Sequence, residues 1–363
     1  MTKRIFNFSA GPATLPLEVL QAAQAELLNF NNTGMSILEI SHRSKAYEAV
    51  NAEAENNMKE LLNLGDDYRV LFLQGGASTQ FAMIPMNFLS PGRTADYILT
   101  GSWSEKALKE AKILGGETHI AATTAEGNYK RIPSVEEIHL SANPAYIHLT
   151  SNNTIFGTQW ANFPSFGDIP LFADMSSDIL CKPFDASKFA LIYAGAQKNL
   201  GPAGVTVVVI RKDLAESNPQ HIPTMLRYHT HAANDSLYNT PPTFSVYMVN
   251  LVLRWIKDNG GSAGMEKRNV EKASLIYDTI DNSGSFYRGH ADKDSRSLMN
   301  VTFRLPNEDL EKTFVTEATK AGMEGLKGHR SVGGLRASIY NAMTLAGCKA
   351  LKDFMLEFQR KNG

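Results

Sequence analysis

The feature that most constrains the fold is an alternation of short apolar runs and amphipathic stretches between residues 69 and 210. Six runs have the length and composition of buried strands: RVLFLQ, DYILTG, AYIHLT, IPLFAD, FALIY and VTVVVI. The segments between several of them are typical of helices, as in SWSEKALKEAKIL after DYILTG. Strands that alternate with helices predict an α/β fold with a mainly parallel sheet that is covered on both faces.

The chain has 363 residues, a length that favours two domains. Two helices are expected before the first strand, at about 16–30 and 46–64. The glycine-rich stretch DNGGSAG at 258–264 is expected to be a hinge, and LMNVTFRL and GLRASI indicate strands of a smaller α/β domain beyond it. The expected division is an N-terminal segment near the active site at 1–15, a large domain at 16–260 and a small C-terminal domain at 261–363.

The bulk composition excludes several classes of protein. A net charge of -1 and a pI of about 6.8 give no sign of a nucleic-acid or membrane-surface partner. The two cysteines, Cys181 and Cys348, lie far apart without a CxxC pair, which argues against a disulfide framework or a structural zinc site. The N-terminus has no signal-peptide pattern, and no apolar run approaches about 18 residues. We therefore expect a cytoplasmic enzyme or binding protein.

Ligands of open parallel sheets bind at the carboxyl ends of the strands, so the residues after each apolar run are the candidates for a site. GGAST at 75–79 follows the first run, and its small residues before a helix let a phosphate approach the backbone. Taken alone, this is more often an ordinary tight turn. It matches neither the GxGxxG fingerprint nor the P-loop.

Three further side chains follow strands. Trp103 offers a stacking surface for a planar ligand, and Thr154 offers a hydroxyl. Asp174 is a carboxylate at the end of an apolar strand, where it must be paired or solvated. Each residue also has an ordinary structural explanation. Trp103 could be a core or surface tryptophan, Thr154 could belong to a turn rich in Asn and Gly, and Asp174 could cap the next helix.

Lys198 stands on a tight loop, YAGAQKNLGPAG, between two apolar strands. A buried lysine loses proton affinity and becomes a nucleophilic amine, and a solvated loop lysine is the alternative. It comes 24 residues after Asp174, so both are expected at one edge of the sheet. Pyridoxal 5'-phosphate (PLP) is bound by a particular set of groups: a phosphate-binding turn, an aromatic ring that stacks on the cofactor, a hydroxyl, a carboxylate and a lysine. All five follow strands of this predicted sheet.

At this point the chain is identified as similar to the class V aminotransferases, a group of fold type I PLP enzymes, over essentially its whole length. The motifs that carry the resemblance are FNFSAGPATLP, ISHRSKAYEAV, LQGGASTQF, TGSWSEKA, TSNNTIFGTQW, ADMSSDI, YAGAQKNLGPAG, SLYNTPPTFSVY and GHRSVGGLRASIYNA. The resemblance implies a large domain with a mainly parallel seven-stranded sheet and a smaller C-terminal α/β domain. It also implies a homodimer with shared active sites.

The resemblance further implies roles for single residues. Lys198 would form the Schiff base with PLP, and Asp174 would pair with the pyridinium nitrogen, which makes these two the catalytic residues. The implied cofactor-binding residues are Gly76, Ala77, Ser78, Trp103, Thr154, Asp174, Gln197, Lys198 and, from the other subunit, Asn239 and Thr240. The implied substrate-binding residues are Ser9, His42, Arg43, His329, Arg330 and Arg336. No metal is implied.

The implied reaction is reversible transamination of 3-phosphohydroxypyruvate with L-glutamate, a step of serine biosynthesis. Some relatives also use 4-phosphohydroxy-L-threonine, which belongs to pyridoxine biosynthesis. 3-Phosphohydroxypyruvate and L-glutamate are both anionic at two ends. The HR pairs at 42–43 and 329–330, together with Arg336, supply cations that suit these ends. Some members carry arginine where this chain has Ser78, so His329 and Arg330 are expected to carry more of the phosphate binding.

Four other interpretations stay open at this point. The first is another class V PLP enzyme, such as a different aminotransferase or a cysteine desulfurase; a desulfurase needs a reactive cysteine on a mobile loop, which neither Cys181 nor Cys348 suits. An oxidoreductase that binds a nucleotide at 75–79 lacks its glycine fingerprint. A PLP-binding protein without catalysis is excluded only by an activity assay. A metal site at His229 and His231 has no obvious third ligand.

Overall fold

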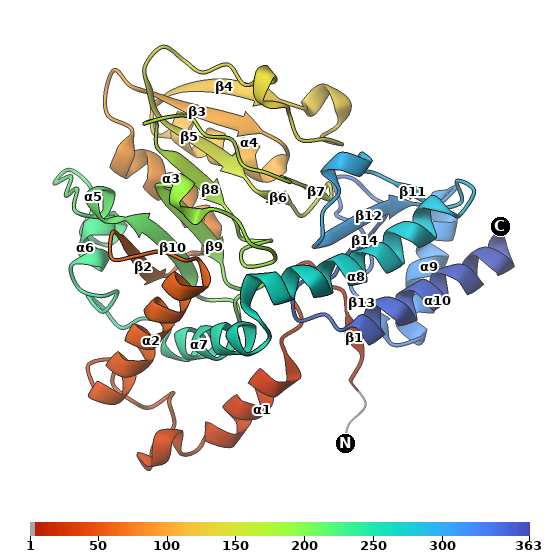
Figure 1. The fold of residues 1–363 in the computed structure, drawn as a ribbon, viewed down its shortest axis with the longest axis horizontal. Helices are drawn as coiled ribbons and strands as arrows, with labels where there is room; N and C mark the ends of the chain where they lie inside the picture. The colour runs from red at the N-terminus through yellow and green to blue at the C-terminus, as the bar shows by residue number, and fades with distance from the viewer. Residues whose placement is uncertain (1–3) are drawn as a thin grey trace.

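The computed structural model describes residues 4–363 and contains a large α/β body with a smaller α/β unit beside it (Figure 1). A seven-stranded sheet in the order β2–β10–β9–β8–β5–β3–β4 forms the centre of the body. Its strands are β2 (Tyr68–Leu73), β3 (Thr94–Leu99), β4 (Glu117–Thr123), β5 (Pro144–Thr150), β8 (Leu171–Asp174), β9 (Leu191–Gly195) and β10 (Thr206–Arg211). Only β10 runs against its neighbours, so the other six strands end at the same edge.

Helices bury both faces of this sheet. One face packs against α1 (Leu17–Glu26), α2 (Lys45–Leu61) and α7 (Thr243–Asp258), and the other against α3 (Gly76–Phe88), α4 (Ser102–Ile113), α5 (Lys212–Ala215) and α6 (Tyr228–Ala232). Along β10, Val207 and Val209 point into the first core and Val208 and Ile210 into the second. A strand that is buried on both faces is therefore continuously apolar, as the sequence indicated.

The predicted strands are confirmed, and the central sheet contains one more that the sequence did not reveal. β4 lies at the edge of the sheet and is mostly half-exposed, so its sequence ETHIAAT mixes polar and apolar residues without a clear pattern. The first helix ends at Glu26, earlier than expected, and the backbone of Asn31 is left-handed at φ 46°. The second helix runs Lys45–Leu61, and the Ser44 hydroxyl caps it by accepting from the Tyr47 amide.

The smaller unit has its own core. It consists of α8 (Gly261–Asp281), β11 (Arg288–Gly289), β12 (Asn300–Arg304), α9 (Glu308–Lys320), β13 (Met323–Glu324), β14 (Leu335–Ser338) and α10 (Leu345–Asn362). α7 ends at Asp258 and α8 begins at Gly261, so the predicted hinge coincides with the link between the two helices. Gly260 has φ 88° there, a conformation that favours glycine. The limits 16–260 and 261–363 stay a proposal.

The N-terminal segment connects the smaller unit to the lysine loop. Its strand β1 (Phe6–Asn7) pairs in parallel with β13, and Phe8 is fully buried in the core of the smaller unit. Further on, the Ala13 amide donates to the Gln197 carbonyl at 2.9 Å. The segment therefore lies between the two parts of the chain.

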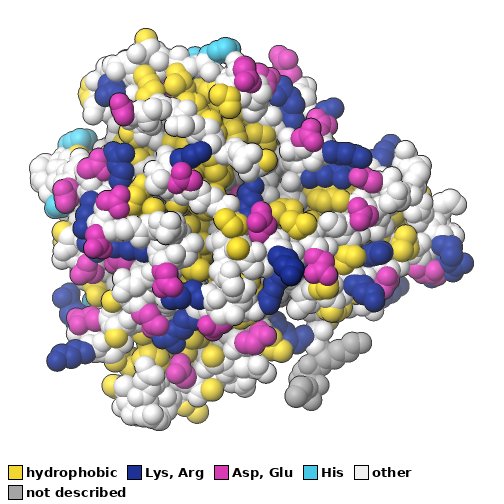
Figure 2. All heavy atoms as spheres, viewed as in Figure 1, with side chains coloured by type: hydrophobic (Ala, Val, Ile, Leu, Met, Phe, Trp, Pro, Cys, Tyr) yellow, Lys and Arg dark blue, Asp and Glu magenta, His cyan; other side chains and the backbone are white. Residues whose placement is uncertain are grey.

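The surface carries no patch of one charge on the face shown in Figure 2, where Lys and Arg alternate with Asp and Glu. Within residues 4–363, none of the helices has the length and apolar character needed to cross a membrane.

We predict that Phe314→Ala destabilises the smaller unit by about 3–5 kcal/mol, because it removes the central ring of a buried aromatic cluster. Hydrogen exchange should lose protection in β12 and β14 before β5 and β8. Phe81→Ala, in the core of the sheet, is the matched control and should produce the reverse order. Equal loss of protection everywhere in both variants would contradict the proposed domain limits.

Candidate active site

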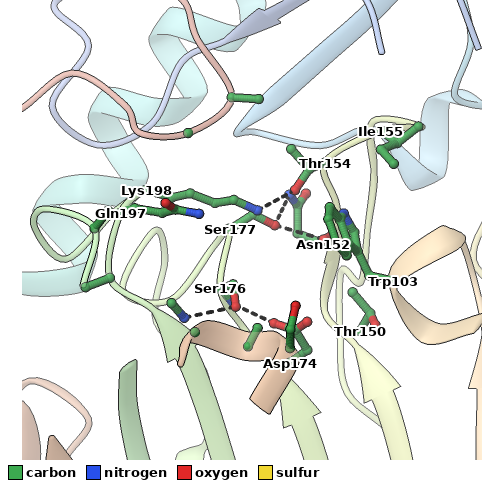
Figure 3. A pocket seen from close by; sticks show the side chains of 18 of the residues that line it. Trp103, Thr150, Asn152, Thr154, Ile155, Asp174, Ser176, Ser177, Gln197 and Lys198 are labelled. Atoms are coloured by element: carbon green, nitrogen blue, oxygen red, sulfur yellow. Dashed lines mark hydrogen bonds between the residues drawn. The ribbon is translucent and has the colours of Figure 1, made fainter. Parts of the chain in front are cut away.

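A cavity of about 350 Å³ opens at the edge where the parallel strands end. Residues at or after the ends of β2, β3, β5, β8 and β9 line the cavity, whereas the edge strand β4 contributes none. The smaller unit and the N-terminal segment close the other sides. The polar and charged residues that line it are Ser78, Trp103, Thr150, Asn152, Thr154, Asp174, Ser176, Ser177, Gln197, Lys198, His329 and Arg336. Figure 3 shows most of their side chains pointing into one space.

Lys198 extends across this cavity from the loop after β9. The loop is pinned at its base, where the Leu200 and Gly201 amides both donate to the Ala196 carbonyl. The Lys198 amine donates to the Thr154 hydroxyl at 2.8 Å on the opposite wall (Figure 3). Desolvation lowers the pKa of Lys198 to about 8, although Asp174 acts in the other direction. A substantial fraction of the amine is therefore neutral near physiological pH.

The positive φ of residue 11 favours glycine, and this residue lies in contact with the Lys198 side chain. Its φ is 144°, and a Cβ atom there would lie 3.5 Å from Lys198 Cγ. The segment thus covers the stem of the lysine.

Asp174 lies at the floor of the cavity, at the end of β8, with only 5% of its surface exposed. One carboxylate oxygen accepts from the Ser176 amide at 2.9 Å. Burial raises the pKa of Asp174, whereas the bonds from Ser176 and the charge of Lys198 lower it. A buried carboxylate in this setting favours a cationic N–H group of a ligand as its partner.

The start of α3 forms a phosphate-sized cradle. Gly75 and Gly76 have φ 92° and 67°, so the chain turns sharply and presents the first turn of the helix to the cavity. Gly76, Ala77 and Ser78 line the cavity there, and amides of a first helical turn have no partner within the helix. A helix of 13 residues adds the field of its dipole, which favours an anion.

Trp103 forms a wall of the cavity from the first turn of α4. The Ser104 hydroxyl holds that turn by accepting from the Thr100 and Gly101 amides. The indole Nε1 is buried and has no hydrogen-bond partner. The Lys106 amine lies over this ring at 4.2 Å from its centroid, and the Lys198 amine lies at 6.0 Å from it. A planar ligand between Lys198 and the ring would stack on this indole.

The smaller unit contributes cations at the other end. Arg336, on β14, donates from Nη1 to the Thr154 carbonyl at 3.2 Å, and its Nε is buried without a partner. His329 lines the same side, and burial together with Arg336 and Arg330 lowers its pKa. These groups suit an anionic ligand that lies between the two units.

Ten of the sequence-predicted site residues line the cavity: Gly76, Ala77, Ser78, Trp103, Thr154, Asp174, Gln197, Lys198, His329 and Arg336. The other six, Ser9, His42, Arg43, Arg330, Asn239 and Thr240, are absent from the lining of this cavity. Asn239 instead lines a separate cavity of about 350 Å³ together with Gly75 and Thr79. The Nε2 atom of His42 is buried without a partner. The roles of all these residues stay predictions.

The sequence analysis missed several lining residues. Thr150 is the last residue of a predicted strand, and Asn152, Ser176 and Ser177 come two or three residues after predicted strands, so the rule that singled out Asp174 would also have found them. The side-chain amide of Asn152 donates to the Ser177 hydroxyl at 2.8 Å, and this hydrogen bond joins the loops after β5 and β8.

The open alternatives receive little support from the geometry. Cys181 and Cys348 are both buried free thiols, and burial raises the pKa of each. The His231 ring bonds the Met225 carbonyl at 2.9 Å. Over residues 4–363, His, Cys, Asp and Glu form no group of three or more that suits a metal ion.

Comparisons with known proteins show which proteins this chain resembles. The family model "Aminotransferase class-V" matches residues 5–351. The phosphoserine aminotransferase of Niallia circulans is 60% identical over 363 residues, which is 100% of both chains. The solved phosphoserine aminotransferase of Bacillus circulans subsp. alkalophilus superposes with a TM-score of 0.98 at 60% identity, over 99% of both chains. The PLP-bound phosphoserine aminotransferase of Trichomonas vaginalis has a TM-score of 0.93 at 40% identity, over 97% of this chain and 100% of that one.

We predict that an amine-directed reagent modifies Lys198 with a half-maximal rate near pH 8, because only the neutral amine reacts and burial lowers its pKa. Exposed lysines should follow a pKa of about 10.4. Reductive methylation after dialysis against hydroxylamine, quantified by peptide mass spectrometry, measures this for each lysine. Lys272 is an internal control, since its pKa is also lowered to about 8 but its side chain is 2% exposed, so the folded protein should protect it. Labelling of Lys198 that follows the exposed lysines would contradict this site.

Proposed function

The chain belongs to the phosphoserine aminotransferases of the class V aminotransferase family, and on that basis we propose how its cavity performs the reaction. It is a PLP-dependent transaminase that exchanges the amino group between L-glutamate and 3-phosphohydroxypyruvate, giving 2-oxoglutarate and O-phospho-L-serine. One observation supports this proposal most strongly. Lys198, whose pKa burial lowers, and the buried carboxylate of Asp174 line the same cavity, and Arg336 and His329 line its far side.

The donor set fits PLP. The free amides at the start of α3 suit its phosphate, the Trp103 indole suits its ring face, and Asp174 suits a protonated ring nitrogen. Thr154 offers a hydroxyl to the ring oxygen, and Lys198 offers the amine for the aldehyde. When bound, PLP withdraws the electrons of the substrate Cα–H bond.

Lys198 has two tasks in this proposal. As a neutral amine it holds the cofactor aldehyde, and once an amino acid has displaced it, it is free to act as a base. It then removes the proton from the substrate Cα atom and would return it to the C4' carbon of the cofactor. Its pKa of about 8 suits both directions of proton transfer near neutral pH. Asp174 keeps the ring nitrogen protonated throughout, because a buried carboxylate is stabilised by a cationic partner.

Arg336 is the group that we assign to the α-carboxylate of both substrates, because its fork binds a carboxylate bidentately. Its buried and unpaired Nε supports this assignment. The distal carboxylate of glutamate and the phosphate of 3-phosphohydroxypyruvate would share one cationic region near His329. One site then serves both substrates in turn, with ping-pong kinetics.

We propose that the active form is a homodimer in which Arg43, His42, Asn239 and Thr240 complete the partner's cavity. The support is that none of these residues lines the cavity of its own chain. Apolar side chains are also exposed along α1 and the segment after it, with Leu28 exposed to 85%. Burying such side chains is what an obligate interface does. The two free thiols agree with a cytoplasmic location, which is part of the same proposal.

The proposed reaction predicts a reversible spectral change. The PLP-loaded protein should show a visible band that falls when L-glutamate is added, while a near-ultraviolet band rises as the cofactor takes up the amino group. 3-Phosphohydroxypyruvate should restore the visible band. An absorbance titration with each compound in turn measures this, and a coloured protein that ignores glutamate would overturn the substrate assignment.

Lys198→Ala serves as the control for this experiment. It should bind PLP more weakly, without the visible band of a lysine-bound aldehyde, and should not exchange amino groups at a measurable rate. A variant with the full band would show that another amine holds the cofactor.

A mixing experiment tests the shared active site. Lys198→Ala and Arg43→Ala should each be nearly inactive as homodimers. After subunit exchange at equal amounts, about a quarter of the wild-type activity should appear, because half of the dimers are then mixed and each has one intact site. If Arg43 acts within its own chain, no mixed dimer has an intact site and the mixture stays inactive.

A further inference from the structure

Three consecutive backbone carbonyls are each held by a different buried asparagine. Asn199 donates from Nδ2 to the Ile179 carbonyl at 3.0 Å. Asn341 donates to the Leu180 carbonyl at 3.1 Å, and Asn269 donates to the Cys181 carbonyl at 2.9 Å. The three asparagines come from the lysine loop, the segment after β14 and helix α8, which are far apart in the sequence.

The three asparagines also bind one another. Asn269 Nδ2 donates to Asn341 Oδ1 at 2.8 Å. The backbone amide of Asn341 donates to Asn199 Oδ1 at 3.0 Å. Their exposed fractions are 0%, 3% and 5% for Asn269, Asn341 and Asn199. We call Asn199, Asn269 and Asn341 the asparagine junction. Asn341 is its centre, because it bonds both of the others and a carbonyl.

The backbone that the asparagine junction holds is strained. Leu180 has φ 58°, a left-handed conformation that is unfavourable for a bulky side chain, and it is fully buried. Such a conformation persists only where the surroundings over-determine it. The hydrogen bonds to the carbonyls on both sides of Leu180 and to its own carbonyl meet that condition.

The junction joins the segments that carry the reacting groups. Asn199 directly follows Lys198, and the held tripeptide begins five residues after Asp174. Asn341 comes five residues after Arg336. Helix α8 begins next to the large body and runs along the smaller unit (Figure 1). One turn beyond Asn269 on this helix, the Lys272 amine donates to the Ile339 and Tyr340 carbonyls at 2.9 and 2.7 Å.

We propose that Asn341 is a positioning residue that fixes the Lys198 amine relative to the Arg336 guanidinium. The amine belongs to the large body and the guanidinium to the smaller unit, so their separation depends on how the two units are joined. The buried hydrogen bonds of the asparagine junction favour one arrangement, because a shift of either unit would leave further buried donors and carbonyls unpaired. This inference rests on the proposed function, which assigns Lys198 and Arg336 to the same substrate.

The test compares Asn341→Ala with Asn250→Ala in the PLP-loaded protein. Asn250 is an equally buried asparagine that bonds Asn57 across α2 and α7 at 2.9 Å, away from the cavity. Three quantities are measured: the melting temperature, the dissociation constant of maleate as a non-reacting dicarboxylate, and the rate of the half-reaction with L-glutamate. The pH at which the visible band titrates is followed in parallel.

We expect both variants to melt at a lower temperature, and only Asn341→Ala to change the site. Its half-reaction should slow by about tenfold to a hundredfold, as for a misplacement of reacting groups. Its affinity for maleate should fall, and the titration of the visible band should shift. Asn250→Ala should keep the wild-type values of these three quantities. If Asn341→Ala also keeps them, the asparagines are structural only and the inference is wrong.

A milder variant keeps the test decisive if Asn341→Ala does not fold. Asn269→Ala removes the bonds of Asn269 to the Cys181 carbonyl and to Asn341 Oδ1. It leaves the bond from Asn341 to the carbonyl of the strained residue Leu180, so a smaller change in the same direction is expected. Wild-type values for Asn269→Ala would then overturn the inference. Failure of the proposed function is distinguished by the wild-type protein, which would itself lack the visible band or its response to L-glutamate.

Discussion

Desolvation of the Lys198 amine is the constraint on which the rest of the site depends. An amine that is exposed to water would stay protonated, whereas enclosure lowers its pKa to about 8. Enclosure requires the edge of the sheet, the hairpin that carries Thr154 and the N-terminal segment with Gly11 to meet around one side chain. The long-range architecture is thus what produces the reactivity of a single residue.

The same enclosure divides the site between two units. The large body supplies the amine, the carboxylate and the helix terminus, all at the ends of strands, while the smaller unit supplies Arg336 and His329. Polar bonds join the units across the cavity. The side-chain amide of Asn152 donates to Asn300 Oδ1 at 2.8 Å, and the Thr302 hydroxyl donates to the Phe156 carbonyl at 2.8 Å. Since these groups are buried, their bonds are costly to break, which favours a fixed cavity wall.

The sequence predicts the part of this arrangement that follows from strand order. Buried strands are continuously apolar, so six were recognisable, and the edge strand β4 was not because half-burial removes the pattern. Lys198, Asp174, Trp103 and Thr154 all follow strands, and their convergence needed only the rule that parallel strands end at one edge. That rule says nothing about Arg336 or His329, because they come from another unit, and only the family resemblance indicated them.

A different limit applies to Arg43 and Asn239. A single chain does not bring them to its own cavity, so neither strand order nor the fold of one chain assigns them a ligand. Their proposed role depends on the arrangement of a second copy. The sequence of one chain contains the residues for that interface, but the symmetry that would place them is a property of the assembly.

The position of Ser78 links substrate choice to the way the two units are joined. With a neutral side chain at the start of α3, the helix terminus alone supplies positive potential there, and it suits the cofactor phosphate. A second phosphate, that of the substrate, would then find its cations around His329 on the smaller unit and, in the proposed homodimer, at Arg43 of the partner subunit. Under this proposal, the preference for a phosphorylated substrate depends in part on the distance between the smaller unit and Lys198. If the asparagine junction sets this distance, it contributes to specificity without contacting the substrate.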